Sequence, residues 1–242
     1  MNMANRFSLD KFKILSGSML KLIAIITMFI DHAALLLAPQ IPFMSAPFIA
    51  IGSKEITIYF LMRKIGRLAF PIFCFLVTEG FAHTKNKKRY ALRLLLFAII
   101  SEIPFNIMVS GLVFNLKYQN VFFTLFLGVL MLSVLDCVHK EFFKIILLIG
   151  TGCIAILLKC DYGLLGVLLI LLMHILKNHP AAQSVLAYPL LSGGAAAFAA
   201  FIPINMYNGD RGFIKSPAMK YAFYIFYPLH ILILIGIKLI LM

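Results

Sequence analysis

The sequence has no tryptophan and few acidic residues: nine Asp and Glu stand against 22 Lys and Arg in 242 residues. Charged residues make up only 13% of the chain, whereas an average soluble domain carries about 25%. Hydrophobic residues make up 62%, which is more apolar surface than a water-soluble chain of this length can bury. This composition excludes an ordinary soluble domain and indicates an integral membrane protein, with tyrosine, phenylalanine and basic side chains as its interfacial anchors.

Several specialised protein classes are excluded as well. The Lys and Arg residues lie between apolar runs and form no single basic face, so we expect a lipid bilayer and no nucleic acid as partner. The cysteines Cys74, Cys137, Cys153 and Cys160 include no C-x-x-C pair, and we expect them to be small buried residues. No internal repeat or Gly-rich phosphate loop is visible. We therefore expect one membrane domain over residues 1–242.

Long apolar runs recur along the chain and predict an all-α, polytopic helical bundle of about eight spans. The first run is longer than the apolar part of a signal peptide, so we expect a retained span. An apolar stretch at 41–62 is interrupted by proline, glycine and charge, and it predicts a re-entrant or interfacial segment. The predicted spans are 20–38, 67–83, 90–109, 121–138, 142–158, 163–176, 184–203 and 221–241.

The distribution of cations predicts the orientation, because cytoplasmic loops are enriched in Lys and Arg. The densest basic group is expected in the cytoplasm, and an even number of spans then places both termini there. Two other groups of cations fall on the outer side, where the enrichment of Lys and Arg in cytoplasmic loops does not predict them. They either weaken the predicted topology or have a function. The first group is Arg63, Lys64 and Arg67, and the second is Arg211, Lys215 and Lys220. The densest group consists of Lys85, Lys87, Lys88, Arg89 and Arg93.

Ionisable side chains within the spans are the most informative feature. Each costs at least about 2.5–3.5 kcal/mol at bilayer depth, so such residues usually face a bundle interior and mark function. A rise of about 1.5 Å per residue places most of them in the outer half of the bilayer, around one outward-opening cavity. The residues expected near this cavity are Asp31, His32, Arg67, Glu102, Asn106, Asp161, Asn205, Tyr227 and His230.

Spacing adds two shared faces to this prediction. Glu102 and Asn106 are four residues apart, and Tyr227 and His230 are three apart, so each pair lies on one face of its helix. A buried histidine can accept a proton from a nucleophile, and a nearby carboxylate can fix its tautomer. Such a pair suits acyl transfer to an amine or hydroxyl, while the basic loop suits the phosphates of a nucleotide-type acyl donor such as acetyl-CoA.

Several ordered motifs resemble the TraX family. They are the run from Lys21 to His32, the run from Ile65 through Arg67 to Phe73 with Glu79-Gly80-Phe81, and the run from Ser101 to Asn106. The ending Tyr224-Ile225-Phe226-Tyr227-Pro228-Leu229-His230 is similar to the same family. The resemblance covers most of the chain. It implies a membrane-bound O- or N-acyltransferase, because the family's namesake is implicated in acetylating the amino terminus of a conjugative pilin.

Carried over, the resemblance implies acetyl-CoA as donor and a cell-surface peptide, polymer or amino sugar as acceptor. The donor would bind at the basic loop. The interpretation assigns His32 as general base, Asp31 as its orienting carboxylate, and Arg67 as either oxyanion stabiliser or partner of Glu102. Supporting roles fall to Glu102 and His230 as further catalytic residues, and to Asn106, Tyr227, Asp161 and Asn205 as substrate-binding residues.

Three other interpretations stay open. In a small proton-coupled transporter the same residues would form a proton relay, although no inverted repeat accompanies them. A metalloenzyme could use two histidines and several carboxylates, but no H-E-x-x-H spacing is present and we expect no metal. In a purely structural scaffold the polar residues would be replaceable by small apolar ones.

Overall fold

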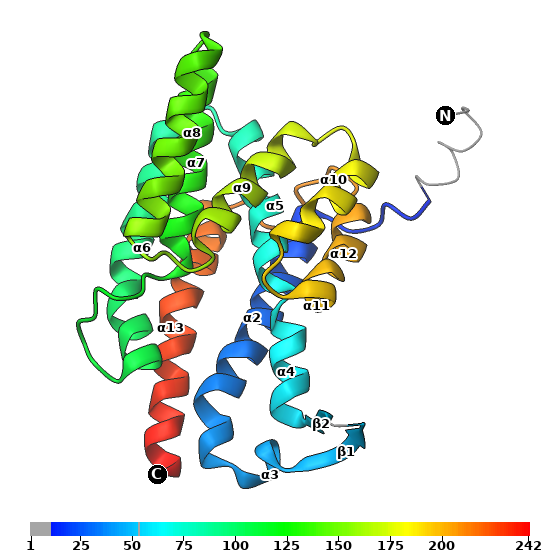
Figure 1. Cartoon of the computed structure of the whole chain (residues 1–242), viewed down its shortest axis with the longest axis vertical. Coiled ribbons are helices and arrows are strands. Elements are labelled where there is room, and N and C mark those ends of the chain that lie inside the picture. Colours follow the sequence, from blue (N-terminus) through cyan, green and yellow to red (C-terminus); the bar gives the residue numbers. More distant parts are fainter. Residues whose placement is uncertain (1–10, 53) are drawn as a thin grey trace.

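The structure is a computed structural model, and it describes residues 11–52 and 54–242 as an almost entirely helical protein (Figure 1). Three of its helices are long and apolar enough to cross a membrane. This confirms the prediction of an all-α membrane protein. The three helices are α2 (Gly17–Leu37), α6 (Lys87–Ser110) and α13 (Pro217–Leu241).

Each long helix begins at a side-chain cap. Ser16 accepts a hydrogen bond from the backbone N–H of Met19, and Ser216 caps α13 in the same way three residues before Met219. The side chain of Asn86 accepts from the backbone N–H of Arg89 at the start of α6. These caps satisfy amide groups that would otherwise lack partners at the helix starts.

The three long helices run parallel to one another. Lys21, near the start of α2, lies within electrostatic range of Lys220 in the first turn of α13, and Lys220 lies within range of Arg93 in α6. Further along, His32 of α2 is hydrogen-bonded to His230 of α13. The starts of α2, α6 and α13 therefore lie at one end of the bundle, while α13 ends at the other (Figure 1).

This arrangement corrects the predicted topology. Because α2 and α13 are parallel, the described chain does not begin and end on the same side, and residues 1–10 lie outside the described part. Arg211 also changes sides: its carbonyl oxygen accepts hydrogen bonds from the backbone and hydroxyl of Ser18. We define the basic end as the end that carries Lys21, Lys87, Lys88, Arg89, Arg93, Lys140, Lys177, Arg211, Lys215 and Lys220.

The prediction of eight spans is not supported. Helices form at most of the predicted places, but α5, α7, α8 and α9 have 15, 17, 17 and 13 residues, fewer than a helical span of about 20 requires. The predicted span 184–203 is divided into short pieces around Pro189 of η2 and around Gly193 and Gly194, where Gly194 has a φ of 57°. The bounds are Ala69–His83, Val121–Cys137, Glu141–Leu157 and Gly163–Ile175, followed by α10 (Pro180–Ala187), η2 (Tyr188–Leu190), α11 (Gly194–Phe198) and α12 (Phe201–Asn205).

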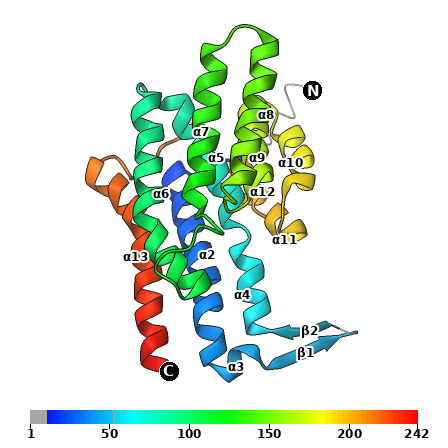
Figure 2. The ribbon, with the colours of Figure 1, turned by 60° about the vertical axis from the view of Figure 1, so that its left-hand side comes forward.

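Residues 41–62 were predicted as a re-entrant or interfacial segment. They contain two strands, and these strands project away from the helical bundle (Figure 2). The antiparallel strands pair Pro47 with Thr57, and the turn between them contains Gly52 with φ of 61°. A helix then packs along α2. The elements are η1 (Ala38–Gln40), α3 (Pro42–Ser45), β1 (Pro47–Ile51), β2 (Lys54–Thr57) and α4 (Ile58–Gly66).

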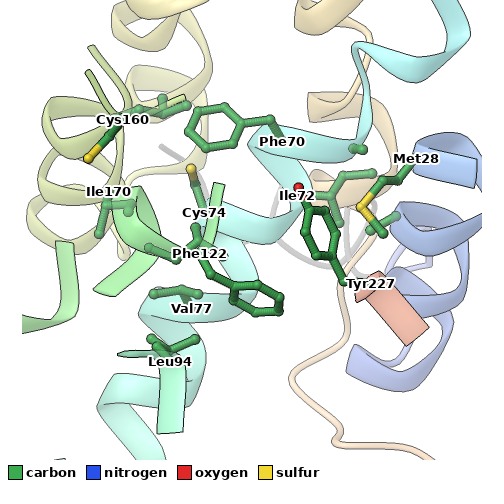
Figure 3. Packing of buried hydrophobic residues seen from close by; sticks show 14 of the residues in the cluster. Met28, Phe70, Ile72, Cys74, Val77, Leu94, Phe122, Cys160, Ile170 and Tyr227 are labelled. Atoms are coloured by element: carbon green, nitrogen blue, oxygen red, sulfur yellow. The ribbon is translucent and has the colours of Figure 1, made fainter. Parts of the chain in front are cut away.

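The core lies between α2, α5, α6, α7, α9 and α13, with aromatic and aliphatic side chains interleaved (Figure 3). Tyr227 of α13 lies beside Met28 of α2 in this packing. The prediction of buried cysteines is confirmed only for Cys74 and Cys160, because Cys137 and Cys153 are exposed on the bundle surface.

Candidate functional site

A small cavity of about 50 Å³ lies among α2, α4, α5, α7, α13 and the loop before α9. Four of the predicted site residues line it: Asp31 and His32 from α2, Asp161 from the loop, and Tyr227 from α13. Gly66, Phe70 and Tyr162 line it as well. The structure therefore brings four of the nine predicted site residues together around one cavity.

The histidines form a chain of two hydrogen bonds. His32 Nδ1 lies 2.7 Å from His230 Nε2, and His230 Nδ1 lies 2.7 Å from the carbonyl oxygen of Phe226. The two imidazole rings are parallel within 1°, and their centroids are 4.9 Å apart. Because the two bonded nitrogens are 2.7 Å apart, the rings lie edge to edge and not one above the other. The direct partner of His32 is thus His230.

The chain fixes the tautomer of both neutral rings. A carbonyl oxygen only accepts, so His230 Nδ1 carries a proton and donates it to Phe226. The Nε2 atom of a neutral His230 then has a lone pair and accepts from His32 Nδ1. The remaining nitrogen of His32, Nε2, is left with a free lone pair, which is the form that a general base requires.

Asp31 is held by a residue that the sequence did not single out as part of the site. Arg63 of α4 donates from its Nη1 to Asp31 Oδ2 at 2.5 Å. The other oxygen, Asp31 Oδ1, is buried with no hydrogen-bond partner. Gly66 permits this contact, since a Cβ there would lie only 2.3 Å from Asp31 Oδ1. Asp31 therefore contacts Arg63 directly, and its role as the group that orients His32 stays a prediction.

Asp161 belongs to a tightly bonded loop. Tyr118 donates its hydroxyl to Asp161 Oδ1 at 2.8 Å, and the Thr124 hydroxyl donates to the Asp161 carbonyl. Burial raises the pKa of the Asp161 carboxyl to about 6, against the effects of Tyr118 and of the nearby Arg67 guanidinium. A carboxyl with this pKa titrates near neutral pH.

Tyr162 follows in an unusual conformation. Its φ of 62° is left-handed, which bulky residues rarely adopt, and its ring stacks on Phe70 at 3.5 Å between centroids. Backbone strain of this kind clusters at functional sites. Phe70 lies within the run from Ile65 to Phe73 that resembles the TraX family, whereas no sequence pattern indicated Tyr162.

Arg67 lies close to the cavity as the cap of α4. It is within electrostatic range of Asp31 and Asp161. Among the described residues it forms no salt bridge, so its charge is available to a ligand. The alternative prediction, a pair between Arg67 and Glu102, is wrong.

Glu102 and Asn106 form a separate polar group on α6. Asn120, fully buried, donates to Glu102 Oε2 at 2.6 Å and to the Ala98 carbonyl, and its Oδ1 caps α7. Glu102 lies within electrostatic range of Tyr227 but does not line the cavity. The shared face of Glu102 and Asn106 is confirmed by the hydrogen bond between their side chains, and their roles in catalysis and binding stay predictions.

Asn205 lies elsewhere. Its side chain donates to Ser184 at 3.1 Å, and the next residue, Met206, pairs through its backbone with Leu15 just before α2. Asn205 is therefore near the basic end, and the prediction that it lies at the outer cavity is wrong because α10 to α12 do not form one continuous span.

The polar cavity and the apolar helices together define a helical membrane protein with a buried histidine-containing site. A family model described as TraX protein matches residues 16–238, and the chain belongs to this family. A relative from Dichelobacter nodosus, named as probable fimbrial assembly protein FimC of serogroup H1, is 31% identical over 250 residues, covering 92% of this chain and 96% of the relative. No solved structure matches.

Proposed function

We propose that the protein is a multi-pass membrane acyltransferase in which His32 is the general base. The observation that carries the proposal is the hydrogen-bonded chain from His32 through His230 to the Phe226 carbonyl, which leaves His32 Nε2 with a lone pair beside a polar cavity. His230 is the positioning residue of this arrangement. Family membership supports the same activity.

The reaction is the transfer of an acyl group from a thioester donor to an amine or hydroxyl. His32 Nε2 accepts the proton of the acceptor as its nitrogen or oxygen attacks the thioester carbonyl carbon. His32 then returns that proton to the thiolate that leaves when the carbon–sulfur bond breaks. Arg67 stabilises the negative charge that develops on the acyl oxygen, and Asp31 Oδ1 accepts a hydrogen bond from the acceptor.

The orientation follows from the basic end. Cytoplasmic surfaces are enriched in Lys and Arg, so the basic end faces the cytoplasm, where acyl-CoA such as acetyl-CoA is available. Asp161 and the cavity lie deeper, toward the outer side. The relative's name as a probable fimbrial assembly protein supports a peptide at the cell surface as acceptor.

A proton-coupled transporter is a weaker proposal for the same residues. A proton relay must pass the proton onward, but the chain from His32 ends at a backbone carbonyl, which accepts a hydrogen bond and cannot release a proton. This end point suits a base held in one tautomer.

The test is turnover of radiolabelled acetyl-CoA by purified protein in nanodiscs. We expect His32→Gln to abolish turnover, while His174→Gln, which changes a histidine packed on Phe81 at the basic end, retains it. Loss of activity in both variants, or in neither, would contradict the role of His32. Helical content measured by circular dichroism shows that the variants are folded.

A further inference from the structure

A group of cations at the basic end lies outside the site described above. Lys21 is within electrostatic range of Arg211 and Lys220, and Lys220 is within range of Arg93. None of these four forms a salt bridge with a carboxylate in residues 11–52 and 54–242. These four cations come from α2, α6, α13 and the loop before α13, and each lies within electrostatic range of at least one other, which favours binding of an anion.

A cavity lies next to these cations. It is open at the surface of the bundle, has a volume of about 390 Å³, and is lined by Arg89, Leu92, Arg93 and Leu96 of α6 and by Tyr221 of α13. Arg93 Nε is buried and has no hydrogen-bond partner. A buried N–H group without a partner is costly and is normally satisfied, so an acceptor from a ligand is expected here.

The neighbouring basic loop is a poorer place for an anion. Lys87, predicted to bind the donor, is already paired with Asp136 of α7 and lies over the Phe81 ring at 4.6 Å. The donor site predicted from the sequence consisted of Lys85, Lys87, Lys88, Arg89 and Arg93. Only Arg89 and Arg93 of that set line the cavity.

We propose that the cavity between α6 and α13 binds a phosphate-bearing group through Arg89, Arg93 and Lys220, with Lys21 and Arg211 contributing positive charge. Guanidinium groups bind phosphate through paired N–H donors, which matches this composition. The phosphate belongs either to a nucleotide-type acyl donor or to a phospholipid headgroup. The first source rests on the proposed function; the second does not.

An aromatic column joins this cavity to the histidines. Tyr221, Tyr224 and Tyr227 are spaced by three residues on α13 and so lie along one side of the helix. Ring centroids of Phe97 and Tyr224 are 5.0 Å apart, and those of Phe122 and Tyr227 are 5.2 Å apart. Tyr227 in turn lies 5.9 Å from His32.

The distance along this column suits an extended donor. Lys21 and His32 are eleven residues apart on α2, which corresponds to about 16 Å along the helix axis. A donor whose phosphates bind at the basic end would have to reach His32 with an arm of that length. The rings of Phe97, Phe122 and Tyr227 in this column are buried, so such an arm would have to displace them from their packing.

The test measures binding of coenzyme A by calorimetry to the full chain in nanodiscs of phosphatidylcholine. We expect Arg93→Gln and Lys220→Gln each to weaken binding at least tenfold. The controls are Lys140→Gln and Lys177→Gln, which remove the same charge at the same end and should change binding less than twofold. Inorganic pyrophosphate should compete with coenzyme A in the unmodified protein.

A second arm distinguishes the two phosphate sources. Nanodiscs containing phosphatidylglycerol are analysed by native mass spectrometry. Retention of this lipid that is lost in Lys220→Gln, without binding of coenzyme A, assigns the site to a headgroup. Binding of neither probe, or equal loss in Lys140→Gln, would overturn the proposal. Lys220 is partly exposed, so this variant serves if Arg93→Gln does not fold.

His32→Gln separates this proposal from the proposed function. It should bind coenzyme A as tightly as the unmodified protein while turning over no acetyl-CoA. Binding at the cation site with no turnover by any form of the protein would refute the acyltransferase alone. Turnover that is insensitive to Arg93→Gln and Lys220→Gln would exclude the acyl donor as the source of the phosphate and leave the headgroup to the lipid arm of the test.

Discussion

Replacing Gly66 by alanine tests the packing that holds Asp31 in the site. The new Cβ would lie 2.3 Å from both Cβ and Oδ1 of Asp31, closer than real Cβ contacts occur. Asp31 cannot turn away freely, because Arg63 holds its other oxygen at 2.5 Å. Helix α4 must therefore move away from α2, and this movement breaks or lengthens the ion pair.

The cost of this variant can be estimated. Overpacking of a filled interior costs about 1–3 kcal/mol, and a chain of this length loses about 3 °C of unfolding temperature per kcal/mol, so we expect a decrease of about 3–9 °C. The assay follows the reaction of a thiol dye with Cys74 and Cys160, which are buried in the folded protein. Cys137 and Cys153 are first replaced by alanine so that only the buried thiols report.

The matched control is Gly150→Ala in the middle of α8. A Cβ there meets no atom within 4 Å, and alanine is the better helix former by roughly 0.5–1 kcal/mol, so the unfolding temperature should stay the same or rise. Equal unfolding temperatures for Gly66→Ala and the parent protein would refute the close packing of α4 against Asp31. Acyl transfer should fall in Gly66→Ala and not in Gly150→Ala.

Three further outcomes are expected. His230→Gln lowers kcat by about 10²-fold and leaves KM for the donor unchanged, because His230 orients His32 without touching substrate; steady-state kinetics measure both. Asn120→Ala removes a helix cap and two side-chain bonds, and lowers stability by about 2–3 kcal/mol in thermal unfolding. The raised pKa of Asp161 means that the folded state binds a proton more tightly than the unfolded state, so stability falls as pH rises from about 4 to about 6. Asp161→Asn should flatten this fall, and an unchanged pH dependence would contradict it.

The sequence predicted the place of most helices and the centre of the site. Apolar runs located α2, α6, α7, α8, α9 and α13 within a few residues, since apolar length alone identifies such helices. The polar residues in those runs pointed to one cavity, and Asp31, His32, Asp161 and Tyr227 do line it. Their rarity in an apolar context is what made them recognisable.

The pairing of side chains could not be predicted in the same way. Asp31 and His32 are neighbours in the chain, yet they point to different helices, one to Arg63 of α4 and the other to His230 of α13. Periodicity gives the face of one helix and not the identity of the helix opposite. The direction of α13 was also missed, because alternation assumed that every apolar run crosses the membrane.

The histidine chain ends at a backbone carbonyl inside α13. Pro228 has no N–H group, and the carbonyl that it leaves without its helical donor is that of Tyr224, four residues earlier. The carbonyl that ends the chain is that of Phe226, which accepts from His230 Nδ1 one turn later in the same helix. A backbone carbonyl only accepts hydrogen bonds, so it fixes the tautomer of His230, and through it that of His32. The sequence showed His230 in the right turn of α13, but the acceptor that decides its tautomer is a backbone group that no side-chain pattern marks.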